Sequence, residues 1–484
     1  MKPFIILENA VPVIFSSPFP VPLNWQMNEG EVWTVLGPNG SGKSYFARVI
    51  GGEYNLQQGT LSFPFMDEIS KLSGSTTRRP QSLIKTIAFN SVFSIADFEG
   101  SYYQQRFNSS ENEMSPCVSD IFSDSDFQQF RQMSSLLEMK HIRDRRLMQL
   151  SSGELRKLLI AKSLLEHPRM LILDHPFMGL DEASRHQLND FLHDLVQKGL
   201  QLFFLVPSES EIPSCTTHLL KMNEGRIEYS GAINQSSGEV PSPSIGNMNV
   251  DWSSFPDSSS TFGDEMVRME NVDISYGSYL INRDINWTIR RGEKWALLGP
   301  NGSGKSTLLS YIFADHPQAY SKKLFLFGRK RGSGESIWDI KRRIGYTSSE
   351  MHLYYKQNIS CLKVVASGFF DTIGLYRQCN DSQIAVARYV MQLLYIDYLA
   401  EQSFLRISSG EQRMTLFARS FVKNPELLIL DEPFHGLDDH NKRLCLQLLA
   451  AYSAQPEKSL VFVTHHKDEI PTYVDKYLML KSLS

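Results

Sequence analysis

Two stretches of this chain have the residue types and the spacing of a phosphate-binding loop. Residues 37–44 and 299–306 both read GPNGSGKS, which fits the pattern G-x-x-x-x-G-K-[ST]. In such a loop, backbone N–H groups close around phosphate oxygens, and the N-terminus of the following helix adds partial positive charge. The residues expected to bind a nucleotide are Gly37, Pro38, Asn39, Gly40, Ser41, Gly42, Lys43, Ser44, Gly299, Pro300, Asn301, Gly302, Ser303, Gly304, Lys305, Ser306 and Thr307.

Each loop is expected to work with an aspartate that lies further along the chain. The runs MLILDHPFMGLD and LLILDEPFHGLD each place a carboxylate, Asp174 or Asp431, at the end of an apolar strand. Such a carboxylate completes Mg²⁺ coordination beside a phosphate loop, whose serine hydroxyl is a second ligand and whose lysine neutralises phosphate charge. The predicted metal ligands are Ser44, Asp174, Ser306 and Asp431.

The same motifs recur in the same order, which indicates a duplicated domain. The tetrapeptide SSGE, for example, starts at Ser151 and again at Ser408. Short apolar runs alternate with amphipathic stretches in each copy, and this predicts an α/β fold with a mostly parallel sheet. We expect one domain over residues 1–229 and a second over 265–484. Residues 230–264 are rich in Ser, Pro and Gly and are predicted to form a flexible linker.

The composition argues against several classes of protein. The 484 residues are 42% hydrophobic and 21% charged, as in globular proteins, and a net charge of -4 gives no strong attraction to nucleic acid or anionic membranes. Five cysteines without a CxxC pair indicate reduced thiols in a cytosolic protein. No run of 18 or more apolar residues occurs, so we expect a cytoplasmic chain, at most peripheral to the inner membrane face.

The motif order resembles that of ATP-binding cassette (ABC) ATPases. A phosphate loop, LSSGE or ISSGE, LILDHP or LILDEP, and GLD follow one another in both halves, and VTHH ends the series in the second half. The segment DHPQAYSKKLFLFGRKRGSGESIWDIKRRIGYTSSEMHLYY is similar to tandem ABC ATPases of the bacterial ModF, or photorepair-protein, type. The resemblance implies an ATPase that uses ATP and Mg²⁺, with an antiparallel β-subdomain and a helical subdomain added to each parallel sheet.

In this family two such domains form a sandwich, so the resemblance implies two composite ATP sites in one monomeric chain. Each ATP would lie between the phosphate loop of one domain and the signature motif of the other. Tyr276 is implied to stack on adenine, and the first half aligns Ile14 there. The implied signature residues are Ser151, Ser152, Gly153, Glu154, Ser408, Ser409, Gly410 and Glu411.

The resemblance also implies that the two sites differ in chemistry. Glu432 has the place of the family's water-activating carboxylate, and His465 that of the histidine that senses the γ-phosphate. The first half has His175 and Pro207 at these positions. We therefore expect Glu432, His465 and Lys305 to be catalytic, and the first half mainly to hold nucleotide. A neutral His175 could still act as a slow base.

Three roles for the ATPase remain open at this point. The first is a soluble mechanochemical ATPase that acts on an unknown target, and the second is the energising subunit of an importer that docks on a separate membrane permease. Ser349 stands where the family usually has a coupling glutamine, which puts ordinary transporter coupling in doubt. The third role, a nucleic-acid- or ribosome-associated factor, is not favoured by the acidic linker. It would use the basic residues Arg329, Lys330, Arg331, Lys341, Arg342 and Arg343.

Overall fold

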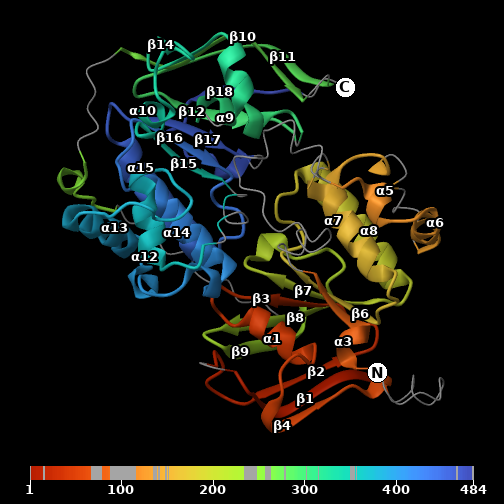
Figure 1. The fold of residues 1–484 in the computed structure, drawn as a ribbon. Helices are drawn as coiled ribbons and strands as arrows, with labels where there is room; N and C mark the ends of the chain where they lie inside the picture. Colours follow the sequence, from red (N-terminus) through yellow and green to blue (C-terminus); the bar gives the residue numbers. More distant parts are fainter. Residues whose placement is uncertain are drawn as a thin grey trace. The chain divides into compact units, whose positions relative to one another are not determined.

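The chain forms two compact units, each with its own apolar core (Figure 1). The first unit comprises the described residues up to 233, and the second comprises those from 248 onward. The computed structural model describes residues 2–14, 17–66, 79–87, 116–133, 139, 142–147, 150, 152–233, 248–256, 263–276, 279–300, 302–313, 316–348, 351, 355, 357–464 and 467–481.

The first unit is built on a six-stranded sheet that is parallel except for its last strand. The order is β5 (Ile84–Ile87), β6 (Met170–Asp174), β7 (Gln201–Val206), β3 (Trp33–Leu36), β8 (His218–Asn223) and β9 (Arg226–Ala232). Alternate side chains of β7 join two different apolar clusters: Leu202 and Phe204 belong to one, and Phe203 and Leu205 to the other. Both faces of the sheet are therefore covered, which explains why the central strands β6 and β7 are almost entirely apolar and buried.

The second unit repeats this arrangement with five parallel strands. The order is β15 (Ile344–Ser348), β16 (Leu427–Asp431), β17 (Ser459–Val463), β12 (Lys294–Leu298) and β18 (Lys476–Met479). The strand that leads into the phosphate loop and the strand that ends in the acidic residue occupy the same places in both units. The predicted α/β fold is confirmed.

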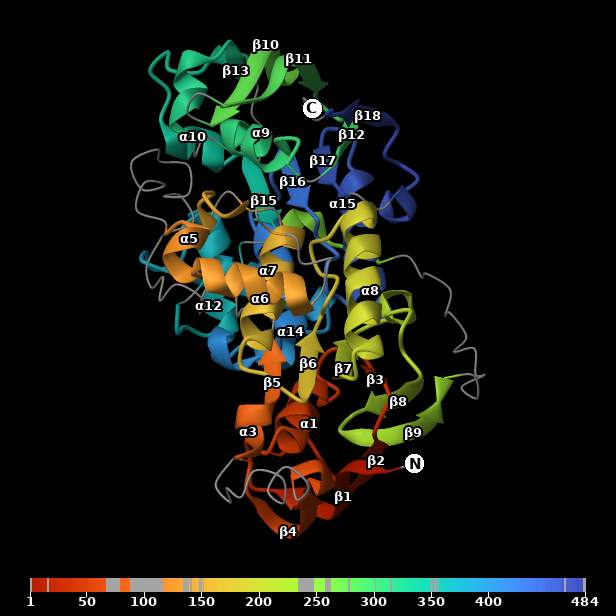
Figure 2. The ribbon, with the colours of Figure 1, turned by 90° about the vertical axis from the view of Figure 1, so that its right-hand side faces the viewer.

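Each unit carries a small antiparallel sheet at one end of its main sheet and a group of helices at the other end (Figures 1 and 2). This confirms the expected β-subdomain and helical subdomain. In the first unit these are β2 (Leu23–Asn28), β1 (Pro3–Pro12) and β4 (Leu56–Ser62), with α5 (Val118–Ile121), α6 (Asp124–Met133) and α7 (Ser152–Leu164). In the second unit they are β11 (Tyr279–Arg290), β10 (Glu265–Tyr276), β13 (Leu324–Leu326) and β14 (Arg329–Lys330), with α12 (Cys361–Ala366), α13 (Asp381–Leu393) and α14 (Ser409–Phe421).

The remaining helices connect the strands of the main sheets. The two that follow the phosphate loops are α1 and α9, and the two that follow the acidic strand ends are α8 and α15. Their bounds are α1 (Lys43–Ile50), α3 (Pro80–Leu83), α8 (Glu182–Gln197), α9 (Lys305–Ile312), α10 (Ile337–Lys341) and α15 (Asp439–Ser453).

Part of the stretch predicted to be a linker packs on the second unit. Val250 and Phe255 are buried in its core, 9% and 7% exposed, on either side of a short 3₁₀ helix, Trp252–Ser254. At the other end of the stretch, β9 extends to Ala232. The two apolar residues anchor residues 248–256 although Ser, Pro and Gly dominate the surrounding sequence, and the precise domain boundaries stay a prediction.

A buried ion pair joins α14 to the rest of the second unit. Lys423 follows this helix, and its ammonium group contacts both carboxylate oxygens of Asp371. It also donates to the carbonyl oxygen of Lys341 at 2.6 Å. The side chains of Lys423 and Asp371 are 7% and 3% exposed. Because α14 begins with the second SSGE motif, this pair helps to fix the position of a candidate functional element.

We expect Asp371→Asn to destabilise the second unit by about 3–5 kcal/mol, because it leaves a buried ammonium group without its counter-charge. Glu401→Gln is the matched control, since it removes an exposed ion pair with Arg388 and should cost less than about 1 kcal/mol. Urea denaturation followed by tryptophan fluorescence measures both changes. Equal effects of the two substitutions would show that the buried pair has no special role.

Candidate active site

The phosphate loop of the second unit connects β12 to α9. Gly304 precedes the helix with a φ of 92°, a left-handed conformation that favours glycine. The Nζ of Lys305 donates to the carbonyl oxygens of Gly299 at 2.6 Å and Pro300 at 2.9 Å. The ammonium group therefore lies within the loop that is expected to wrap around phosphate.

A serine hydroxyl and a strand-end carboxylate meet beside this loop. Ser306 lies in the first turn of α9, Asp431 ends β16, and the Oγ of Ser306 donates to Oδ2 of Asp431 at 3.3 Å. Hydroxyl and carboxylate oxygens are ligands that Mg²⁺ takes together with phosphate oxygens and water. Within the described part of the chain, no group of three or more His, Cys, Asp and Glu side chains could hold a metal ion. The hydroxyl and carboxylate oxygens of Ser306 and Asp431 fit a magnesium ion whose remaining ligands would come from phosphate and water.

The first unit repeats this geometry. The Nζ of Lys43 donates to the carbonyl oxygens of Gly37 at 2.6 Å and Pro38 at 2.8 Å. The Oγ of Ser44 donates to Oδ2 of Asp174 at 3.5 Å, and burial raises the pKa of the Asp174 carboxyl. Both units therefore contain the groups that are expected to bind a nucleotide and its metal ion.

The residue after the strand-end aspartate distinguishes the two units. Glu432 and His175 have left-handed φ values of 51° and 50°. The N–H of Glu432 donates to the carbonyl of Val463 at 2.9 Å, and that of His175 donates to the carbonyl of Leu205 at 3.0 Å. The backbone is the same at both positions, so the substitution changes the chemistry of the side chain without moving its starting point.

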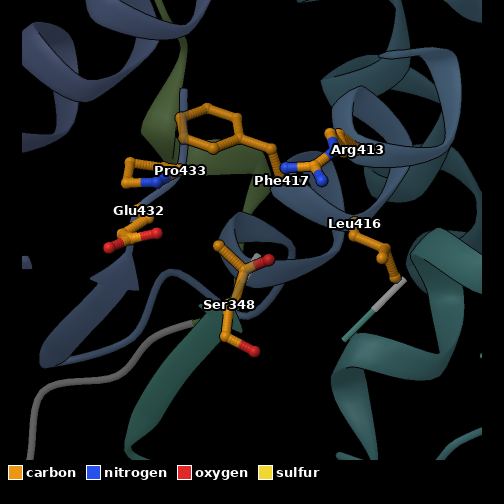
Figure 3. A pocket seen from close by; sticks show the side chains of 7 residues that line it. Ser348, Arg413, Leu416, Phe417, Glu432 and Pro433 are labelled. Carbon is orange, nitrogen blue, oxygen red and sulfur yellow. The ribbon is translucent and has the colours of Figure 1, made fainter. Parts of the chain in front are cut away.

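Glu432 borders a pocket between the ends of β15 and β16 and one face of α14 (Figure 3). The Glu432 carboxylate and the Arg413 guanidinium lie on opposite sides of the view, with Ser348 below them. Ser348 is also the neighbour of Asp431 in the strand register. The lining residues are Thr347, Ser348, Arg413, Leu416, Phe417, Glu432 and Pro433.

His175 has different surroundings in the first unit. Its Nε2 lies 3.6 Å from Oδ1 of Asp174, and the residue is 8% exposed. Arg156, which matches Arg413 in the second unit, is 3% exposed, and burial lowers its pKa to about 10. The imidazole thus lies against the predicted metal-binding carboxylate.

The second signature motif begins its helix with a capping box. The N–H of Glu411 donates to Ser408 Oγ at 3.3 Å, and the N–H of Ser408 donates to Oε2 of Glu411 at 2.8 Å. The hydroxyl of Tyr398 donates to the other oxygen, Oε1, at 2.8 Å. In the first unit, Arg145 Nη1 donates to Oε1 of Glu154 at 2.9 Å. Each signature glutamate is therefore engaged within its own unit.

These side-chain contacts were not predicted from the sequence, although one local signal was available. The spacing S-x-x-E is that of a capping box and appears in both signature motifs. The contact between His435 and Glu432, and that between Tyr398 and Glu411, have no such local signal.

Some predicted site residues lie outside the described part of the structure, and their roles stay predictions. The backbone of Tyr276 ends β10, but its side chain is not described. The residues outside the description are Ser151, Asn301, Ser349 and His465, together with the side chain of Ser152.

The basic segment considered for nucleic-acid binding is largely engaged within the second unit. Arg331 is 2% exposed and donates to Glu335 at 2.8 Å. Lys341 is equally buried, and Arg343 donates to Glu426 at 2.6 Å. These three cations stabilise the fold, which leaves a smaller basic surface than the sequence indicates.

We expect Ser408→Ala to destabilise the second unit by about 1 kcal/mol, since it removes the acceptor for the first turn of α14. Ser409→Ala, one residue further into the helix, serves as the control and should cost less than about 0.5 kcal/mol. Urea denaturation measures both. An equal cost at the two positions would contradict the capping assignment.

Comparisons with known proteins agree with this geometry. The family model described as "ABC transporter" matches residues 21–178 and 282–435. The chain is 34% identical to the "ABC transporter ATP-binding protein ModF" of Escherichia coli (strain K12), over 93% of this chain and 91% of that protein. It is 28% identical to an uncharacterized ABC transporter ATP-binding protein of Schizosaccharomyces pombe, over 94% of this chain and 93% of that protein.

Two solved structures share the fold at low sequence identity. One is the archaeal ribosome recycling factor aABCE1 in complex with the ribosomal stalk protein aP1, with a TM-score of 0.51, 17% identity, and coverage of 93% of this chain and 83% of that chain. The other is an RNase-L Inhibitor, with a TM-score of 0.52, 15% identity, and coverage of 98% and 90%. Among the described residues, no helix is long and apolar enough to cross a membrane.

Proposed function

The chain belongs to the ABC transporter family of ATP-binding proteins and carries two ABC domains, and we propose that it hydrolyses ATP mainly at its second phosphate loop. One observation carries this proposal. Glu432 and His175 occupy the same backbone position in the two units, and only the second unit places a carboxylate there.

The residues of the second unit divide the work of hydrolysis. Lys305 would neutralise charge on the β- and γ-phosphates, and Ser306 and Asp431 would hold Mg²⁺. When bound, the metal ion neutralises charge that develops on the phosphate oxygens. Glu432 orients a water molecule and accepts its proton as the oxygen of the water bonds to the γ-phosphorus and the bridging P–O bond breaks. His465 is expected to contact the γ-phosphate.

The first unit is proposed to bind ATP and to turn it over slowly. Lys43, Ser44 and Asp174 have the same arrangement as their counterparts. The imidazole of His175 brings no negative charge to the attacking water, and Pro207 offers no side-chain hydrogen bond. ATP would therefore stay bound to this unit while the second unit goes through repeated rounds of hydrolysis.

We infer from the family that each ATP is completed by the signature motif of the other domain. ATP binding would then close the two domains, and hydrolysis would release them. This cycle of closing and opening would act mechanically on a bound target. An importer subunit is the second candidate role, because the Escherichia coli relative is named as an ABC transporter ATP-binding protein. The internal pairing of Arg331, Lys341 and Arg343 disfavours a nucleic-acid role.

Glu432→Gln should lower steady-state ATP turnover by about 100-fold or more, because general-base catalysis contributes about 10²–10⁴ in rate. ATP binding should persist. His175→Ala is the matched variant and should change turnover by less than about twofold. Phosphate release and binding of a fluorescent ATP analogue measure the two quantities. If His175→Ala is as damaging as Glu432→Gln, the division of roles is wrong.

If the ATP sites are composite, a variant in the signature motif of one domain should affect ATP turnover at the phosphate loop of the other domain. Ser152→Arg should reduce turnover by about tenfold or more, because a bulky side chain in the first signature would block approach to the nucleotide of the second loop. Ser409→Arg faces the slow site and should have a clearly smaller effect on turnover. ATPase assays of both variants, with circular dichroism as a folding control, test this. The reverse order of severity would contradict the crossed arrangement.

A further inference from the structure

A histidine side chain lies against the proposed catalytic carboxylate. His435 follows Glu432 by three residues in the turn between β16 and α15, and its N–H donates to the Glu432 carbonyl at 3.3 Å. The Nδ1 of its ring lies 2.8 Å from Oε2 of Glu432, a close polar contact whose alignment is not that of a hydrogen bond, and the two side chains are 8% and 12% exposed. The turn therefore brings the imidazole back onto one specific oxygen of the carboxylate.

The backbone that carries this imidazole is fixed from the helical side. Nη1 of Arg413 donates to the carbonyl oxygen of His435 at 2.7 Å, and Arg413 is 6% exposed. Arg413 belongs to α14 and lines the same pocket as Glu432 (Figure 3). The position of the histidine is thus tied to the helix that begins with the signature motif.

The first unit lacks both members of this contact. Met178 matches His435, is 3% exposed, and donates its N–H to the carbonyl of His175 at 3.2 Å. The turn is therefore retained. The first unit has the thioether of Met178 in place of the His435 imidazole, and the imidazole of His175 in place of the Glu432 carboxylate. A thioether has no N–H group and no charge, so it cannot make this polar contact with a carboxylate. The second unit has both the imidazole of His435 and the carboxylate of Glu432, and the first unit has neither group at the matching positions.

We propose that His435 is a positioning residue for Glu432, an inference that rests on the proposed role of Glu432 in activating water. A glutamate side chain turns about several single bonds, and a displacement of about 1 Å can cost about 100-fold in rate. Because the imidazole contacts Oε2, it orients the carboxylate so that Oε1 can bind the water molecule.

The test compares His435→Met with His435→Asn in the full chain. Methionine is accommodated at this buried place in the first unit, whereas the Nδ2 of asparagine retains a donor near the position of Nδ1. We expect His435→Met to lower kcat for ATP by about tenfold, with KM and ATP binding changed by less than about twofold. His435→Asn should recover most of the rate, and Met178→Leu is the matched control without effect.

A double variant separates positioning from a general structural role. When His435→Met is added to Glu432→Gln, single-turnover rates should fall no further, since the group to be positioned is already altered. The inference is overturned if the loss is additive, if His435→Asn is as slow as His435→Met, or if KM rises while kcat is kept. An unchanged rate for Glu432→Gln alone would instead refute the proposed function.

Discussion

The meeting of a helix-initial serine with a strand-end aspartate is the constraint on which each unit depends. Ser306 and Asp431 are 125 residues apart, and Ser44 and Asp174 are 130 apart, yet each pair forms a hydrogen bond. They meet because parallel strands bring their carboxyl ends to one edge of the sheet, with β17 or β7 between the two strands concerned. Strand order, the apolar layers and the helices that connect the strands all serve this juxtaposition.

Much of the fold was predictable because its signals are local. Gly304, for example, belongs to a short pattern that specifies a loop and a helix start. Buried apolar strands and the repeated motif order predict the parallel sheets. Contacts between side chains distant in sequence were not predictable in the same way. Arg331 reads as a surface cation in the sequence and is buried beside Glu335 in the structure. The linker prediction overlooked Val250 and Phe255, since composition averages conceal two anchoring residues.

The two units have kept the backbone of the site while changing the side chains that react. His175 retains the left-handed φ of Glu432, a conformation that costs of order 1–3 kcal/mol in a residue other than glycine. Its retention without a carboxylate indicates that the turn has a second use, and we infer that it orients the predicted metal-binding aspartate and the following loop. Binding geometry and reaction chemistry are thus specified by different atoms of the same short segment, and they can change separately.

The capping box at Ser408 affects the electrostatic repulsion between a triphosphate and the glutamate of the signature motif. Both oxygens of Glu411 accept hydrogen bonds, and Glu154 is paired with Arg145. A triphosphate that approached such a motif would encounter backbone N–H groups and the positive end of a helix instead of a free carboxylate. The like-charge repulsion that a glutamate in this place would otherwise exert is therefore reduced before any nucleotide arrives. In the proposed composite sites, the SSGE motif would present an amide surface to a phosphate while retaining an acidic residue in its sequence.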